Sequence, residues 1–308
     1  MKKGKLVIID GNALIHRAYH ALPLLTTKKG ELTNAIYGFL LVFLKAIREF
    51  QPDYIAACFD LPAPTFRHKK FPSYKAQRPK TPEELTEQIP KIKRVLEAFS
   101  VSIFEKQGFE ADDLIGTIAK SMEASEVETI ILSGDLDTLQ IVDKNTKVYT
   151  LRKGVKDTIL YDEERVKVRY QIPPSRLPDF KALKGDPSDN IPGVPGVGDK
   201  TASQLLREFG SLENLYKEIE QGSQRAKKIR PRIKEVLLKT KDQAFFSKML
   251  AQIRYDVPLD FNLKKCKWRD YDREEVVKIL KEFEFFGLIN RLALLKSEPG
   301  DGQKRLSI

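Results

Sequence analysis

Through the first half of the chain, short apolar runs alternate with longer amphipathic stretches. Residues 5–9, 54–59 and 129–132 have the pattern of buried strands, and residues 34–50 and 114–122 that of helices. Strands separated by helices predict a parallel sheet, because each helix carries the chain back to the same edge before the next strand starts. We therefore expect an α/β fold with a mostly parallel central sheet flanked by helices.

The second half of the chain has a different pattern. From about residue 172 the strand signals fade, and helical segments of mixed charge follow one another, the last at residues 273–285. The predicted division is an α/β core at 1–180 that includes a basic segment at about 62–95, a helical region at 181–290, and a tail or linker at 291–308. The second region is expected to be all-helical.

Charge and composition limit the classes of function. The net charge is +11, which favours a polyanionic partner such as nucleic acid or an acidic membrane surface. No run approaches the roughly 18 to 20 apolar residues that span a bilayer, and the N-terminus has no room for a signal peptide, so a cytoplasmic location is expected. The two cysteines, Cys58 and Cys266, and the three histidines, His16, His20 and His68, do not have the spacing of zinc ligands. Both cysteines are expected to be buried.

Acidic side chains recur where predicted strands end and where helices begin. Asp10, Asp60 and Asp135 each follow an apolar run, and that edge of an open parallel sheet is where ligands bind. Taken singly, each acid also suits a turn or the first turn of a helix. The full set is Asp10, Asp60, Glu110, Asp112, Asp113, Asp135, Asp137, Asp186 and Asp189.

Gathered at one edge, these carboxylates would repel one another unless cations compensated their charge. Carboxylates suit Mg²⁺ or Mn²⁺, and two such ions about 3.5 to 4 Å apart stabilise the attacking and leaving oxygens of a phosphoryl displacement. A chain of net charge +11 that concentrates acid in this way is best explained as a nuclease that uses two metal ions.

The basic segment at residues 64–78 interleaves cations with aromatic rings, as single-strand-binding surfaces do. The alternative is a basic surface loop that Phe66 and Phe71 anchor in the core. Just beyond it, Thr81 is predicted as a helix N-cap, with Pro82 at the first helical position and Glu84 completing a capping box.

A glycine-rich segment at residues 191–202 precedes an amphipathic helix. Its glycines would let the backbone approach a phosphate closely, and N–H groups at the helix start would point outward, so it is predicted to contact DNA backbone without reading sequence. The alternative is a glycine turn that only packs two helices together. The basic run at 225–234 either extends this surface or is a solvated helix face.

Together these motifs resemble the 5' nuclease domain of bacterial DNA polymerase I, within the flap endonuclease family. The resemblance covers roughly residues 5–290. It rests on Asp10-Gly11, Arg17 to Ala21, Phe59-Asp60, Phe66-Arg67, Tyr74-Lys75 with Arg78, Glu110 to Asp113, Gly134-Asp135 with Asp137 and Gln140, and Gly185 through Thr201. It implies a PIN-like 5' nuclease fold with a helical arch at about 62–95 and a C-terminal helix-hairpin-helix region.

The resemblance also implies roles for individual residues. Asp10, Asp60, Glu110 and Asp112 would hold one Mg²⁺, and Asp135, Asp137, Asp186 and Asp189 a second, with Asp113 in support between them and Mn²⁺ as a substitute. The implied catalytic residues are Asp10, Asp60, Lys75 and Arg78, the last two at the scissile phosphate. The implied substrate contacts are Arg17, Phe66, Arg67, Tyr74, Gly193, Gly196, Gly198, Lys200 and Thr201, with K⁺ as a candidate ion at the hairpin.

The implied activity is 5'-to-3' exonuclease and 5' flap endonuclease cleavage that leaves 5'-phosphates, in primer removal and DNA repair. Implied partners are branched, nicked or flapped double-stranded DNA, RNA-primed DNA, and a DNA polymerase module in cis or in trans. A monomer is expected, and no membrane. Two alternatives stay open: a non-catalytic DNA-binding module, and a PIN-like ribonuclease, which would need neither the arch nor the hairpin.

Overall fold

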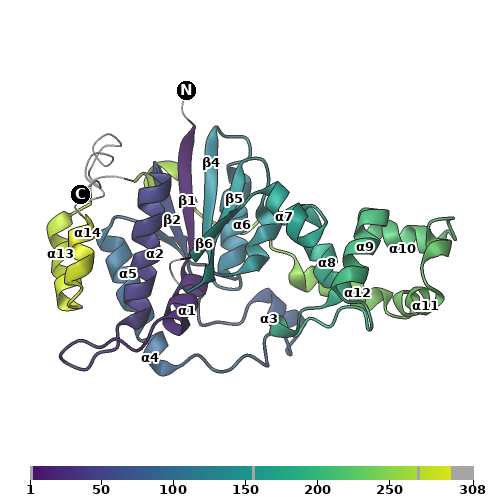
Figure 1. The fold of residues 1–308 in the computed structure, drawn as a ribbon, viewed down its shortest axis with the longest axis horizontal. Coiled ribbons are helices and arrows are strands. Elements are labelled where there is room, and N and C mark those ends of the chain that lie inside the picture. The colour runs from purple at the N-terminus through teal and green to yellow at the C-terminus, as the bar shows by residue number, and fades with distance from the viewer. Residues whose placement is uncertain (1–2, 155–156, 269–270, 293–308) are drawn as a thin grey trace, which may run out of the picture.

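A six-stranded sheet forms the centre of the computed structural model, which describes residues 3–154, 157–268 and 271–292 (Figure 1). In spatial order the strands are β3 (Ser102–Phe104), β2 (Tyr54–Cys58), β1 (Gly4–Asp10), β4 (Val127–Ser133), β5 (Thr146–Lys153) and β6 (Asp157–Tyr161). Neighbours pair in parallel, except that β6 runs antiparallel to β5. The predicted α/β fold with a mostly parallel sheet is confirmed.

Both faces of the sheet are buried, as a parallel sheet requires. Successive side chains of β1 point to opposite faces. Leu6 and Ile8 join one apolar cluster, and Val7 and Ile9 join another. The strands therefore read as continuous apolar runs, and their ends are where polar side chains first become possible.

Helices cover both faces. One cluster includes α1 (Gly11–Ala21), α2 (Asn34–Phe50), α5 (Gln88–Ala98), α13 (Arg273–Glu282) and α14 (Phe286–Leu292); the other includes α6 (Ala111–Ser121), α7 (Glu163–Tyr170) and α8 (Leu177–Lys184). The assignment of residues 273–285 to the helical appendage was wrong, because Val276, Ile279 and Leu280 pack in the core cluster with α2 and α5. An amphipathic pattern shows that one face is buried, but not against which partner.

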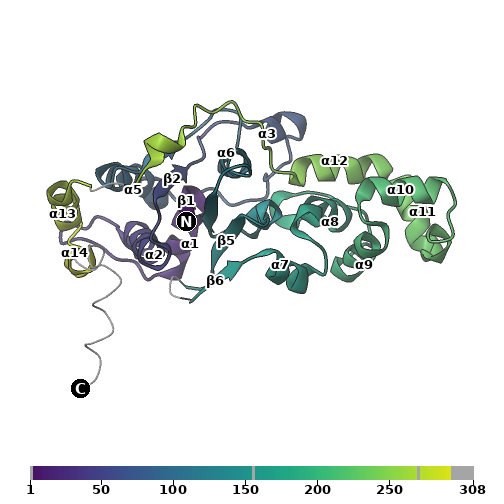
Figure 2. The same ribbon diagram turned by 90° about the horizontal axis from the view of Figure 1, so that it is seen from above.

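A helical extension leaves the other end of the sheet (Figures 1 and 2). It contains α9 (Asp199–Phe209), α10 (Leu212–Glu220), α11 (Pro231–Lys239) and α12 (Lys241–Ala251), of which α12 returns to pack along α8. Short 3-10 turns complete the chain: η1 (Leu136–Ile141), η2 (Pro174–Arg176), η3 (Pro187–Asp189), η4 (Ala226–Lys228) and η5 (Leu263–Cys266). Most of the predicted tail, residues 293–308, lies outside the described residues.

The arch crosses below the sheet from α3 (Phe66–Lys70) to α4 (Glu83–Thr86) (Figure 1). The predicted capping box at Thr81 was wrong: Pro82 is the N-cap of α4, and α4 makes a single turn without a side-chain cap. The next helix, α5, begins at Gln88. The buried side-chain oxygen of Gln88 accepts a hydrogen bond from the Ala35 amide at 2.9 Å and so caps α2. Long-range capping of this kind leaves no local sequence signal.

Two further findings concern the cysteines and membrane-spanning helices. Cys58 and Cys266 are both buried and free, as expected. Within the described part of the chain, none of the helices combines the length and the apolar character needed to cross a membrane.

Candidate active site

Asp10 and Asp135 lie at the point where the strand order reverses. From β1 the chain adds β2 and β3 on one side, and β4 and β5 build the other side, so the carboxyl ends of β1 and β4 border the crevice where open α/β sheets bind ligands. Asp10 ends β1 and caps α1, accepting from the Ala13 amide at 3.1 Å and from the Ser133 hydroxyl at 2.6 Å. Asp135 follows β4 and caps η1 through the Asp137 amide at 2.9 Å.

The start of α6 contributes a second group of acids. Asp60, after β2, accepts a hydrogen bond from the Ala111 amide at 2.8 Å, so the two elements meet. Glu110 is the N-cap of α6, and Asp112 and Asp113 lie in its first turn, where the helix dipole favours negative charge. Local helix chemistry therefore places these side chains beside the strand ends.

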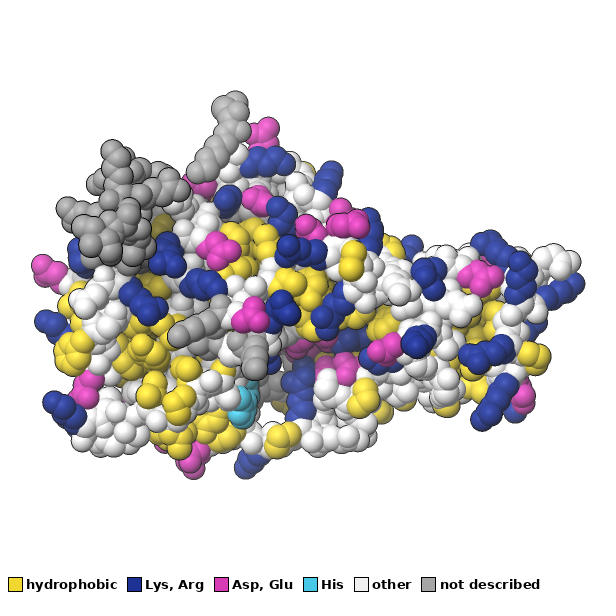
Figure 3. All heavy atoms as spheres, in the orientation of Figure 1, with side chains coloured by type: hydrophobic (Ala, Val, Ile, Leu, Met, Phe, Trp, Pro, Cys, Tyr) yellow, Lys and Arg dark blue, Asp and Glu magenta, His cyan; other side chains and the backbone are white. Residues whose placement is uncertain are grey.

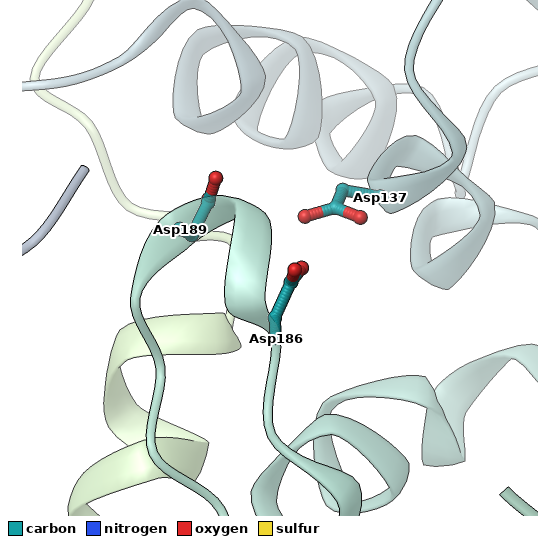
Figure 4. Close-up of side chains that lie close together, drawn as sticks. All are labelled: Asp137, Asp186 and Asp189. Carbon is teal, nitrogen blue, oxygen red and sulfur yellow. The ribbon is translucent and has the colours of Figure 1, made fainter. Parts of the chain in front are cut away.

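A third group comes from η1 and η3. Asp137, Asp186 and Asp189 each place an oxygen within 4.8 Å of the others, a spacing at which one metal ion can be shared. Figure 4 shows the carboxylates of Asp137 and Asp186 facing each other, with Asp189 at the other end of the η3 turn. Asp186 is oriented by the Ser188 amide at 2.9 Å and hydroxyl at 2.7 Å.

Burial first, and then the nearness of other acids, perturbs the ionisation of these carboxylates. Burial, with smaller effects from Asp60 and Asp135, raises the pKa of Asp10 to about 7. Burial raises the pKa of Asp112 well above its ordinary value, and Asp10, Asp135 and Asp137 raise it further. Burial also raises the pKa of Asp137 to about 6, although Lys181 opposes the shift. Such groups resist carrying charge together until a cation is added.

The donor set fits a divalent cation. A central cavity of about 20 Å³, enough for one water or ion, is lined by Glu110, Asp112, Asp135, Asp137 and Asp189 among others. All of these are oxygen donors, the kind that hard divalent ions prefer. Figure 3, in the orientation of Figure 1, shows acidic side chains in a hollow near the middle of the visible face, with Lys and Arg side chains beside them.

Cations of the chain itself hold the acids in this structure. The Lys75 ammonium donates to Glu110 at 2.8 Å, and Arg78 pairs with Asp189. Lys181 donates to Asp137 and, at 2.6 Å, to Asp186. Burial opposes the charge of Asp186, but Lys181 and Ser188 together lower its pKa to about 2. Lys181 was missed by sequence reasoning, since one lysine in an amphipathic helix carries no distinguishing signal.

The positions of Arg67 and Asp113 do not fit the roles in substrate and metal binding that the resemblance implies. Arg67 is only 2% exposed, and its guanidinium donates to Asp113 at 2.7 and 2.9 Å, to Glu110 at 3.2 Å, and to the backbone oxygens of Leu250 and Gln252. Its side chain is fully engaged within the protein, which leaves no donor turned to a substrate. Asp113 is completely buried against it, so the pair ties α3 to α6 and α12 instead of facing an ion.

The aromatic rings of the arch are also largely internal. Tyr74 is 3% exposed, and its hydroxyl shares its single hydrogen between Asp189 at 3.1 Å and Glu110 at 3.2 Å, so in this structure it orients two acids and cannot stack on a base. Phe71 packs edge-on against Phe246, and Phe66 lies under the Arg67 guanidinium. The anchored-loop alternative describes these rings better than an open stacking surface does.

The remaining predicted substrate contacts are Arg17 and the residues of the glycine-rich hairpin. Arg17 donates to the backbone oxygen of Arg152 at 2.7 Å. Gly193 is buried, its amide donates to Ser247 at 3.1 Å, and an added Cβ would lie 2.2 Å from the Gly185 nitrogen, so it serves packing. The other hairpin residues lie at or beside the start of α9, where the backbone is open: Gly196, Gly198, Lys200 and Thr201.

Comparison with known proteins matches this arrangement to one family. Residues 5–171 match the 5'-3' exonuclease, N-terminal resolvase-like domain, and residues 172–274 match the 5'-3' exonuclease, C-terminal SAM fold. The chain belongs to the 5'-3' exonuclease family. As a member of this family it is 43% identical over 302 residues to DNA polymerase I of Bacillus subtilis (strain 168), and 40% identical over 298 residues to DNA polymerase I of Bacillus caldotenax.

These alignments cover 98% and 97% of this chain, and the chain spans about a third of the length of the relatives, 34% and 33%. Among solved structures, a bacteriophage T5 flap endonuclease in a pseudo-enzyme-product complex with DNA and metal ions aligns with a TM-score of 0.65 over 95% of this chain and 100% of that one, at 18% identity. The catalytic core of Rad2 in complex with DNA substrate aligns with a TM-score of 0.60 over 96% and 93%, at 17% identity. Both support the fold.

Proposed function

We propose that this chain is a structure-specific 5' nuclease, which degrades DNA from 5' ends and cuts 5' flaps, leaving 5'-phosphates. The observation that carries the proposal is the convergence of eight acids from strand ends, α6, η1 and η3 on one crevice, in a chain of net charge +11. Family membership supports the same activity. Asp113 is left out of this set because Arg67 neutralises it.

The acids divide between two Mg²⁺ ions, which Mn²⁺ can replace. Asp10, Asp60, Glu110 and Asp112 serve one, and Asp135, Asp137, Asp186 and Asp189 the other; the mutual approach of Asp137, Asp186 and Asp189 supports the second set. Bound divalent ions lower the pKa of an attacking water and neutralise charge on the leaving oxygen. Lys75 and Arg78, which already reach Glu110 and Asp189, would turn to the scissile phosphate and stabilise its developing charge.

The duplex is proposed to lie along the helical extension. The uncapped start of α9 offers backbone N–H groups to a phosphate, with Lys200 in its first turn, and K⁺ is a candidate ion at this hairpin. Arg17 is the proposed contact at the sheet. Substrates would be flapped, nicked and RNA-primed duplexes, as in primer removal and repair in the cytoplasm.

A polymerase module in cis is proposed from the relatives named DNA polymerase I, of which this chain matches a third. The protein is proposed to act as a monomer.

The test is cleavage of a 5'-end-labelled flap duplex in Mg²⁺ or in EDTA, comparing wild type with Asp10→Ala. Metal-dependent cutting near the junction that the variant loses would establish the proposed chemistry. Tight flap binding without cutting in any divalent ion would instead indicate a non-catalytic DNA-binding module. Preferential cutting of single-stranded RNA would indicate a ribonuclease.

A further inference from the structure

Lys181 places a positive charge of the chain inside the second group of acids. It lies on α8, and its ammonium contacts both Asp137 and Asp186. The three side chains are mostly buried, with exposed fractions of 18% for Lys181, 25% for Asp137 and 15% for Asp186. Without this ammonium, the two carboxylates would face each other across a poorly solvated gap (Figure 4).

The ammonium lies where a divalent ion would be held. An ion bound by Asp137, Asp186 and Asp189 would contact the same two carboxylates, Asp137 and Asp186, that Lys181 now contacts. A cation on a lysine and a divalent ion cannot share that gap, because the two positive charges would repel at contact distance. Binding of the ion and the present position of the Lys181 ammonium therefore exclude each other.

The structure provides a place for the displaced side chain. A cavity of about 150 Å³ adjoins the acids, and Lys181 itself lines it together with Asp137, Asp186, Tyr170 and Phe180. Ring faces attract ammonium and guanidinium groups. Both rings already do so here: Lys184 lies over Phe180 at 5.6 Å, and Arg169 lies over Tyr170 at 5.4 Å. Rotation of a flexible four-carbon stem would move the Lys181 ammonium towards this cavity.

We propose that Lys181 is a displaceable internal cation, which holds Asp137 and Asp186 together in the metal-free enzyme and moves to the adjacent cavity when a divalent ion takes its place. This inference rests on the proposed function, since it takes these acids as the second ion site. Lys181 thereby keeps the metal-free fold stable and makes the second ion bind more weakly than the bare carboxylates would allow. Lys75 and Arg78 neutralise other acids, Glu110 and Asp189.

The first test is titration calorimetry of Mn²⁺ into the full chain. Lys181→Met, which keeps the stem and removes the charge, should tighten the weaker Mn²⁺ event by about tenfold or more, as expected when a charged competitor is removed. The matched control is Lys184→Met. It removes the same charge from the same helix beside the same cavity, but Lys184 pairs with Asp199 and not with the acids, so a change within about twofold is expected.

The second test is thermal unfolding in EDTA and in saturating Mn²⁺. Lys181→Met should melt below wild type in EDTA and level with it in Mn²⁺, because the ion replaces the missing charge. Lys181→Gln should change the Mn²⁺ affinity and the melting temperature in EDTA in the same directions as Lys181→Met does. Agreement between the two variants excludes misfolding of one of them as the cause. Equal destabilisation of Lys181→Met in EDTA and in Mn²⁺ would show that Lys181 belongs to a fixed ion pair, and would overturn the proposal. An Mn²⁺ affinity of Lys181→Met no higher than that of Lys184→Met would also overturn it.

The two proposals fail in distinguishable ways. A wild-type enzyme that cuts flaps in Mg²⁺, with Mn²⁺ affinity unchanged by Lys181→Met, would overturn only the role of Lys181. A wild-type chain that neither binds Mn²⁺ nor cuts would overturn the proposed function as well.

Discussion

Replacing Arg67 with methionine should destabilise the protein far more than an ordinary surface substitution. The guanidinium makes two hydrogen bonds to Asp113 and one to Glu110, and it also donates to the backbone oxygens of Leu250, in α12, and Gln252, just after it. In the variant, Asp113 stays completely buried, with only the amides of Glu110 and Arg254 to stabilise its charge. A buried charge without a counter-ion is among the costliest features in a protein.

The expected loss is about 3 to 5 kcal/mol, the usual result of removing one partner of a buried ion pair. At roughly 2 °C per kcal/mol for a chain of this size, the melting temperature should fall by about 6 °C or more. Differential scanning calorimetry in EDTA measures this directly. Arg94→Met is the control, because Arg94 and Glu282 form an exposed pair whose loss should cost about 1 kcal/mol or less.

The two possible roles of Arg67 predict opposite patterns. If Arg67 positions α3, α6 and Glu110, then stability falls first, and flap binding by the folded variant weakens only a little. If Arg67 contacts substrate phosphate, as its neighbourhood in the sequence suggested, then flap binding falls while the melting temperature stays within about 2 °C of wild type. The second pattern would refute the structural role given to Arg67 here.

Three further predictions follow from the site. Gly193→Ala should lower the melting temperature by several degrees, because its Cβ would lie 2.2 Å from the Gly185 nitrogen, whereas Gly198→Ala, with open space, should change it little. Burial raises the pKa of Asp10 from 3.8 to about 7. The charge of Asp10 therefore destabilises the metal-free fold fully above about pH 7 and not at all below about pH 4. In EDTA at pH 8, Asp10→Asn should melt at a higher temperature than wild type, and this difference should vanish near pH 4. Lys75→Met should slow single-turnover cleavage at least about tenfold, while flap affinity measured in Ca²⁺ changes little.

The sheet and its acid-bearing edge could be predicted because local chemistry determines both. Apolar runs too short for helices, joined by amphipathic segments, leave a parallel sheet as the simple solution. Parallel strands end at one edge, so acids that directly follow strands, such as Asp10 and Asp135, must lie near each other. Their approach to Asp186 and Asp189 depends on how α8 and η3 pack, which the resemblance implied and local pattern could not.

Other features depend on contacts between distant segments. Arg67 and Tyr74 belong to a basic, aromatic segment that looks exposed in sequence, yet Leu250, Gln252 and Asp189 enclose them. Gln88 caps a helix more than fifty residues away. Sequence patterns show which side chains are able to be buried or to donate, but only the packed structure shows which partner each one meets.

Whether these carboxylates hold the ions that cut DNA is measured most directly by anomalous scattering from crystals of the wild-type chain soaked in Mn²⁺. Two peaks are expected within the acid cluster, one bordered by Asp10, Asp112 and Glu110, and the other by Asp137, Asp186 and Asp189 with the Lys181 ammonium displaced. Full Mn²⁺-dependent flap cleavage by the same preparation, with no peak in coordination distance of these oxygens, would contradict the assignment.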